Sequence, residues 1–454
     1  MDFDVIVVGA GPGGAVAARN LARAGFKVGL FDSDTRDTLS KTILVDAEKD
    51  SFDAAGVPRP TPDEIPYHQS AVRFFSGRGR QVFHITREHP SYPIFLDKVV
   101  KRMLADAEKA GAKFFGGFRA IAPVVSQCRV CGVTFQERDQ KQEVRARLVI
   151  DATGFNAALV RKLDPELGLV FEEKPSDIVV AENHFCEIDE EKAVQALKDG
   201  LHVDREIWNT IGKFGPYSTQ YAHLSMKNER AYILVGRKAS YGPPSPGEII
   251  EQYTQKQGYF RKMIYGGKGS IRIRHSLDRL VTDGFMVIGE AACIVIPAHG
   301  SGVSSAMLAG HLAAQAAIPA LRNGGVTTAS LWPYAWEYQT KRGMVLATYS
   351  AVRLMADGLS PDQLADMMES GVMSEDDVFS AFYPKVAKIA PGSIPKRLVG
   401  FIKHPDLVKP MLKMAKAVTA ITRHYPRYPK TFDPQAFAQW KEKSRKIFSP
   451  LIQT

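Results

Sequence analysis

Residues 289–302, GEAACIVIPAHGSG, combine side chains that could bind or act on a ligand. One acid, Glu290, stands among small residues, and Pro297 and His299 follow before two more glycines. Small residues let a ligand approach the backbone, and a carboxylate accepts hydrogen bonds from hydroxyl groups. Apolar residues recur at helical spacing from Gly302 onward, which predicts a helix whose positive N-terminal end points at that ligand.

A glycine-rich turn near the N-terminus predicts a second ligand-binding segment. Gly9, Gly11 and Gly14 form G-x-G-x-x-G after a predicted buried strand, Val5 to Val8, and before a predicted helix. The first glycine permits the tight turn, the second lets a pyrophosphate approach, and the third permits close packing of helix on strand. The helix N-terminus offers N–H groups to phosphates, and Asp32, which ends the next predicted strand, suits a ribose diol. This unit predicts dinucleotide binding.

The chain beyond this unit selects between NAD and FAD. A simple NAD dehydrogenase would continue with alternating strands and helices, whereas here a predicted helix at about 94–110 is followed by successive predicted strands that end at Asp151. The turn ATG at 152–154 and the later segment DGFMVIGEAA resemble two further fingerprints of FAD enzymes built like glutathione reductase and p-hydroxybenzoate hydroxylase. This resemblance implies FAD as cofactor and implies that Glu290 holds its ribityl chain.

The residues that the resemblance implies as FAD contacts come from all three segments. Pro297 and His299 are expected beside the isoalloxazine ring, with the following helix N-terminus at its pyrimidine edge. The full set is Gly9, Gly11, Pro12, Gly13, Gly14, Asp32, Ala152, Thr153, Gly154, Gly289, Glu290, Ala291, Pro297, His299, Gly300, Ser301, Gly302 and Val303. No metal site is expected.

The run IPAHGSGVSSAMLAG resembles the P-x-H-G-G-G segment of the geranylgeranyl reductases, flavoproteins that saturate isoprenoid chains. Pro297, His299, Gly300 and Gly302 match, and Ser301 replaces a glycine. The segment DATGFNAALVRKL, the helical C-terminal third and HYPRYPKTF extend the resemblance over nearly the whole chain. It implies an oxidoreductase of lipid metabolism that transfers hydride from reduced FAD to a carbon–carbon double bond. The implied substrate is an isoprenoid or other apolar, lipid-like molecule held in an apolar tunnel.

Two departures from the family concern the substrate region. The family pattern P-x-x-Y-x-W-x-F-P corresponds to PYSTQYAHL, which keeps Pro216 but has Tyr221 in place of Trp, and the family's P-C-G segment is replaced around Ile43. Tyr217, Tyr221 and His223 are candidates for the substrate cavity. The alternative is that these three are ordinary aromatic packing of a half-buried strand. No residue is assigned as the proton donor.

Two other activities remain open because one FAD scaffold hosts several chemistries. The main alternative is an FAD-dependent monooxygenase that hydroxylates an apolar or aromatic small molecule, while the halogenase pattern W-x-W-x-I-P is absent. The second is a non-redox FAD protein of the lycopene cyclase type. Since no second G-x-G-x-x-G is present, reducing equivalents are expected from NAD(P)H bound without a dedicated domain or from a ferredoxin-like protein.

The predicted fold class is α/β, with a Rossmann-like FAD-binding domain of the glutathione reductase or p-hydroxybenzoate hydroxylase type, a β-sheet substrate domain and a helical C-terminal region. The FAD-binding domain is discontinuous and is assigned to 1–40, 92–160 and 270–325. The substrate domain is assigned to 41–91 and 161–269, and the basic helical region to 326–454.

The positive charge is concentrated near the C-terminus. Residues 385–454 hold 15 Lys or Arg and three Asp or Glu, whereas the whole chain has a formal net charge of +10. We expect the segment 403–430 to associate with an anionic membrane surface, and the alternative is a solvated helical face. No apolar run approaches the ~18 residues of a membrane span and no basic leader precedes the first strand, so a cytoplasmic protein, peripheral on the inner face of the membrane, is expected. No nucleic-acid partner is expected.

Overall fold

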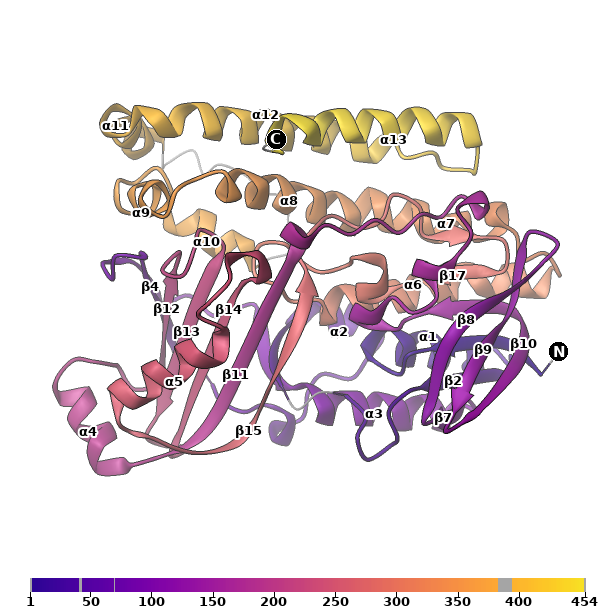
Figure 1. Cartoon of the computed structure of the whole chain (residues 1–454), viewed down its shortest axis with the longest axis horizontal. Helices are drawn as coiled ribbons and strands as arrows, with labels where there is room; N and C mark the ends of the chain where they lie inside the picture. The colour runs from indigo at the N-terminus through magenta and orange to yellow at the C-terminus, as the bar shows by residue number, and fades with distance from the viewer. Residues whose placement is uncertain (1, 41–42, 69, 383–393, 453–454) are drawn as a thin grey trace.

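Two large sheets, a small two-stranded sheet and a layer of helices form the described part of the molecule. The computed structural model describes residues 2–40, 43–68, 70–382 and 394–452. In Figure 1 the sheet that contains the N-terminal strand lies at one end, a second large sheet lies at the other, and the C-terminal helices run across the top of both. The α/β class and the helical C-terminal region predicted from the sequence are confirmed.

The N-terminal sheet has eight strands, five of them parallel in the order β17-β10-β1-β2-β7. Its register aligns Val8 at the end of β1 with Asp151 at the end of β10, and Asp151 with Val287 at the end of β17. The three predicted cofactor segments each leave the sheet at this edge. The strands are β1 (Phe3–Val8), β2 (Val28–Asp32), β7 (Lys113–Gly116), β8 (Phe118–Ser126), β9 (Arg129–Glu137), β10 (Gln140–Asp151), β16 (Val281–Thr282) and β17 (Phe285–Val287).

Helix α1 (Pro12–Arg23) packs on this sheet, and α3 (Leu96–Lys109) and α6 (Val303–Arg322) pack against α1. Glycines bring α1 and α6 close together, because a Cβ atom on Gly310 would lie 2.2 Å from the carbonyl oxygen of Gly13. Pro12 at the first helical position starts α1 without losing a helix hydrogen bond. The expected helix at about 94–110 and the helix from Gly302 are confirmed within a few residues.

The second large sheet has seven strands in the order β15-β11-β14-β13-β12-β4-β5. A two-stranded sheet of β3 (Leu44–Glu48) and β6 (Ser91–Phe95) lies between the large sheets, and α2 (Lys49–Ala54) follows β3. Helices α4 (Glu190–Lys198) and α5 (Pro246–Gln257) connect strands of the seven-stranded sheet. The strands are β4 (Ala71–Phe75), β5 (Gln81–Ile85), β11 (Ile178–Ile188), β12 (Glu206–Ile211), β13 (Ser218–Ser225), β14 (Arg230–Lys238) and β15 (Phe260–Arg272).

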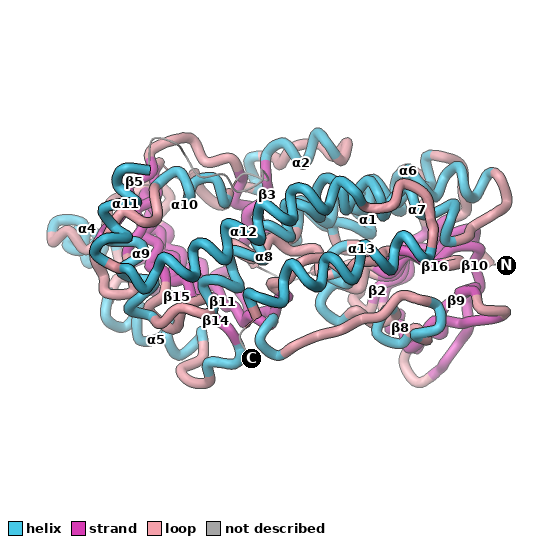
Figure 2. Tube along the Cα trace, turned by 90° about the horizontal axis from the view of Figure 1, so that it is seen from above, coloured by secondary structure: helices cyan, strands magenta, loops and turns pink. Residues whose placement is uncertain are grey.

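The C-terminal helices lie above the sheets, and Figure 2 shows α8, α12 and α13 running along the length of the molecule. A π-helical turn, Gln339–Gly343, joins α7 to α8. Among the described residues, no helix combines the length and the apolar character that crossing a bilayer requires. The helices are α7 (Thr328–Tyr338), α8 (Met344–Asp357), α9 (Pro361–Glu369), α10 (Glu375–Ala381), α11 (Ile394–Lys403), α12 (Val408–His424) and α13 (Pro434–Phe448).

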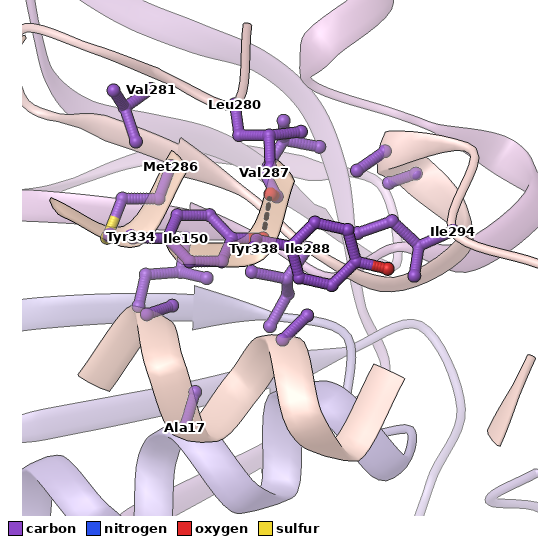
Figure 3. Packing of buried hydrophobic residues seen from close by; sticks show 14 of the residues in the cluster. Ala17, Ile150, Leu280, Val281, Met286, Val287, Ile288, Ile294, Tyr334 and Tyr338 are labelled. Atoms are coloured by element: carbon purple, nitrogen blue, oxygen red, sulfur yellow. Dashed lines mark hydrogen bonds between the residues drawn. The ribbon is translucent and has the colours of Figure 1, made fainter. Parts of the chain in front are cut away.

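The largest hydrophobic core joins the N-terminal sheet to these helices. Tyr334 and Tyr338 of α7 pack against the end of β17 beside Ile150, as Figure 3 shows, and the Tyr334 hydroxyl donates to the carbonyl of Val287 at 3.0 Å. Both tyrosines are almost fully buried. This core holds the edge at which the cofactor segments leave the sheet.

Candidate functional site

The glycine-rich turn after β1 has the geometry of a phosphate-binding loop. Gly9 has a φ of +102°, and a Cβ atom there would lie 2.2 Å from the carbonyl oxygen of Ala152. A Cβ atom on Gly11 would meet no atom within 4 Å, so open space lies over the loop, and no side chain caps the N-terminus of α1. The free N–H groups of that helix end can therefore bind an anion.

Asp32 stands at the opposite side of the same loop. Its carboxylate accepts the N–H of Ala10 at 2.6 Å and the N–H of Asp34 at 2.9 Å. Burial raises the pKa of Asp32, while these two backbone bonds act in the opposite direction. These backbone bonds hold the acid at the strand end, where it is positioned for a diol.

The turn 152–154 is organised by Asp151, which the sequence places at the end of a strand. The buried carboxylate accepts the N–H and the hydroxyl of Thr153 and the N–H groups of Leu159 and Val160. The Thr153 hydroxyl in turn accepts the N–H of Ala158. Asp151 therefore has a structural role, because its bonds hold the turn in close contact with Gly9.

Glu290 lies in a short 3-10 helix, Gly289–Ala292, directly after β17. Its Oε1 accepts the N–H of Arg272 at 3.1 Å, which ties the acid to the end of β15. The Arg272 side chain is fully buried, bonds to Glu173 and stacks over the ring of Phe155. Sequence reasoning missed Arg272, because the partners of its side chain, Glu173 and Phe155, lie 99 and 117 residues away and no motif marks it.

Residues 295–303 form a tight loop that we call the cradle. Ser301 donates its hydroxyl to the carbonyl of Asp46 on β3 at 2.5 Å, and the Tyr217 hydroxyl donates to the carbonyl of Pro297 at 2.5 Å. Gly300 has a φ of +80°, and a Cβ atom there would lie 2.5 Å from Ile271 of β15. The cradle is thus held between the two-stranded sheet and the seven-stranded sheet.

His299 is the polar side chain at the centre of the cradle. Its Nδ1 accepts the N–H of Ser301 at 3.3 Å, so in the neutral ring the proton is on Nε2. Burial lowers the pKa of His299 to about 3, which keeps the ring neutral. The Nε2 atom is buried and has no hydrogen-bond partner among the described residues. A ligand atom that accepts this hydrogen bond would satisfy the group, so the cradle fits a bound cofactor.

The N-terminus of α6 lies at the end of the cradle. Gly302 precedes the helix, no side chain caps it, and the helix continues for 20 residues. Such a long helix presents partial positive charge and unpaired N–H groups at its start. Together with the loop at Gly9, the cradle fits the two ends of an extended dinucleotide.

The three substrate-cavity candidates occupy different positions. Tyr217 precedes β13 and reaches the cradle, as described above. Tyr221 and His223 share one face of β13, where Tyr67 stacks on His223 at 4.2 Å between ring centres and its hydroxyl lies 3.4 Å from that of Tyr221. His223 is 1% exposed, and burial lowers its pKa to about 3. His223 therefore lies in the core behind Tyr67, while Tyr217 adjoins the cradle.

A cavity of about 190 Å³ adjoins this aromatic cluster beside β3 and β6. Tyr67 forms part of its wall together with polar side chains that include Lys49, Arg87 and His89. Both cations are neutralised, since Lys49 pairs with Glu88 and Arg87 pairs with Asp376 at 2.9 Å. The lining is mixed polar and apolar.

Known proteins resemble this chain in sequence. The FAD binding domain family model matches residues 2–328. Digeranylgeranylglycerophospholipid reductase of Sulfolobus acidocaldarius is 24% identical over 449 residues, which cover 97% of this chain and 96% of that protein.

Two solved structures share the fold. A geranylgeranyl bacteriochlorophyll reductase-like protein from Thermoplasma acidophilum superposes with a TM-score of 0.70 at 20% identity, over 91% of this chain and 99% of that one. PqsL of Pseudomonas aeruginosa, described as a probable FAD-dependent monooxygenase, superposes with a TM-score of 0.57 at 16% identity, over 80% of this chain and 98% of that one.

Proposed function

Since this chain belongs to the FAD binding domain family and is an FAD-dependent oxidoreductase, we propose that it is a reductase that saturates carbon–carbon double bonds of an isoprenoid lipid. The observation that carries this proposal is the full-length match to a digeranylgeranylglycerophospholipid reductase. That match includes the seven-stranded sheet and the C-terminal helices, which lie beyond or between the cofactor segments. The full-length match therefore supports a similar substrate as well as the same cofactor.

The proposed cofactor contacts follow from the site. The turn at Gly9 to Gly14 and Asp32 would hold the adenosine and pyrophosphate end, and Glu290 the ribityl hydroxyls. The cradle and the start of α6 would hold the flavin end. When bound, FAD supplies reversible two-electron chemistry at its isoalloxazine ring. The chain itself orients the cofactor, and the neutral Nε2–H of His299 is available as a hydrogen-bond donor to it.

Anaerobic photoreduction tests the proposed reductase activity. The reduced protein would be mixed with a geranylgeranyl lipid, or with its fully saturated analogue as the control, and flavin reoxidation would be followed by absorbance. We expect reoxidation only with the unsaturated lipid, together with a product that has gained hydrogen by mass spectrometry. Reoxidation by neither lipid would contradict the proposal, and product formation without reoxidation would indicate the non-redox alternative.

A monooxygenase is the second candidate, because PqsL, a probable FAD-dependent monooxygenase, shares this fold. Exposure of the photoreduced protein to oxygen separates the two activities. A long-lived flavin hydroperoxide absorbance would favour the monooxygenase. Rapid, featureless reoxidation would favour the reductase. The same preparation, titrated with NADH, NADPH and a reduced ferredoxin, would identify the electron donor.

We also propose that the chain docks peripherally on the inner face of an anionic membrane through α11 and the start of α12. Leu398, Val399 and Ile402 on α11 are 59%, 52% and 80% exposed, and Leu412 on α12 is 55% exposed. Exposed lysines flank them, namely Lys396, Lys403, Lys409 and Lys413. An apolar face bordered by cations matches the chemistry of an anionic lipid surface.

The surface that we propose differs from the predicted segment 403–430. Ala417, Ile421 and His424, in the second half of α12, are buried, because α12 packs on α8 and α13. Their apolar surface is therefore not available to a membrane. Three of the four exposed apolar residues instead lie on α11 before residue 403, and Leu412 lies at the start of α12. Residues 385–393 of the basic region lie outside the described residues. Sedimentation with anionic and with neutral liposomes tests the proposal, and equal binding to both would contradict the electrostatic part.

A further inference from the structure

Asp46 lies between the cradle and the seven-stranded sheet. Its backbone carbonyl accepts the Ser301 hydroxyl at 2.5 Å, so β3 is in direct contact with the cradle. Side chains alternate along a strand. Ala47 packs toward α1 and α6, whereas Leu44 packs with Tyr67 and with residues of the seven-stranded sheet. Asp46 projects on the same side as Leu44, toward that sheet.

The Asp46 carboxyl has an unusual environment for an acid. Asp46 is only partly buried, so the residue keeps accessible surface next to the cradle. Among the described residues, no ion pair or hydrogen bond holds the carboxyl. The titratable groups that interact electrostatically with it are the phenols of Tyr221 and Tyr232 on the facing sheet and of Tyr67 in the loop before β4. Glu48, two residues along β3, is paired with Arg342.

This environment keeps a proton on the acid. Burial raises the pKa of Asp46 to about 7, because the charged form would lose its hydration without gaining a partner. Near neutral pH a large fraction of the carboxyl is therefore protonated. The tyrosines around it are much weaker acids, since burial raises the pKa of Tyr67 and Tyr221 above the ordinary value.

The proposed reaction needs such an acid. An isolated carbon–carbon double bond is unpolarised, so its saturation requires a proton on one carbon as well as hydride on the other. The histidines near the cradle are poor donors, because burial lowers the pKa of His299 and of His223 to about 3 and leaves both rings neutral. Of these titratable groups, Asp46 is the strongest acid that still carries its proton near neutral pH.

Resting on the reductase function proposed above, we propose that Asp46 is the proton donor to the substrate double bond. The carbon–carbon π bond breaks, one carbon takes the proton from the Asp46 carboxyl, and the other takes hydride supplied by the reduced flavin. The substrate is reduced by two electrons, the flavin is oxidised, and Asp46 is left as a carboxylate. Water returns the proton to Asp46 before the next turnover.

The kinetic test uses Asp46→Asn, with Asp46→Glu and the exposed Asp50→Asn as companions. In Asp46→Asn, we expect FAD content and photoreduction to match the wild type. Its reoxidation by a geranylgeranyl lipid should slow by at least ~100-fold, the usual scale for loss of a general acid. Asp46→Glu should recover part of the rate, and Asp50→Asn should behave as wild type. Reoxidation of Asp46→Asn within about threefold of wild type would overturn the proposal.

Infrared spectroscopy gives a readout that does not depend on turnover. The wild-type minus Asp46→Asn difference spectrum should contain a protonated-carboxyl band that titrates near pH 7, and the Asp50→Asn difference should lack it. Loss of that band well below neutral pH would overturn the proposal, because the acid would then be ionised. A wild type that keeps the band but is not reoxidised by the lipid would contradict the reductase function and still support a protonated Asp46.

Discussion

Replacement of Glu290 by Gln tests whether Glu290 binds the ribityl chain of FAD or acts as a catalytic acid. Gln keeps the size of the side chain and an oxygen that can accept the N–H of Arg272, now at 3.1 Å from Oε1. The apoprotein should therefore unfold at nearly the same urea concentration as the wild type. What the change removes is the negative charge offered to ribityl hydroxyl groups.

The magnitude follows from the strength of charged hydrogen bonds. A bond to a charged group contributes ~1.5–3 kcal/mol and a neutral one ~0.5–1.5 kcal/mol, so each hydroxyl bond should weaken by about 1 kcal/mol. With one or two such bonds, the FAD dissociation constant should rise about 5- to 30-fold. Titration calorimetry of the apoprotein with FAD measures this, with the exposed Glu172→Gln as control. An unchanged dissociation constant combined with lost turnover would refute the clamp and return Glu290 to the chemistry.

Three further predictions concern packing, pH and the membrane. Gly310→Ala should lower the free energy of unfolding in urea by about 3 kcal/mol or more, because its Cβ atom would lie 2.2 Å from the backbone of α1. The control Gly325→Ala, whose Cβ atom would meet open space, should cost little, and equal effects of the two changes would contradict the helix contact. His223 has a folded pKa of about 3, below the ordinary value near 6.5, so the stability it permits is complete above pH 6.5 and is lost as pH falls toward 3. His223→Phe should thus gain about 2 kcal/mol on the wild type between pH 7 and pH 5 in urea titrations, and a constant difference would refute a neutral buried ring. Ile402→Glu should weaken liposome binding about tenfold or more, because it removes an 80% exposed apolar side chain. The control Leu201→Glu should leave binding unchanged, and a similar loss in both variants would contradict the proposed membrane surface.

The sequence determined to a large extent where the proposed cofactor segments lie. The segments at Gly9, at 152–154 and at Gly289 each follow a strand, and parallel strands align their carboxyl ends at one edge. The pattern of local residues was therefore enough to predict that these segments meet. The cradle and the helix after Gly302 were predictable for the same reason, because small residues and helical periodicity are local signals.

The surroundings of the proposed reaction were decided only by the tertiary structure. Asp46 stands in a segment without a recognisable motif, and its significance comes from Ser301, 255 residues away, and from tyrosines of another sheet. The proposed membrane surface also depends on tertiary contacts. The sequence of α12 carries bases and apolar residues on several faces, and only packing on α8 decides which of them remain exposed. Burial, which sets both the proton affinity of Asp46 and the exposure of Ile402, depends on contacts between distant segments and has no local signal.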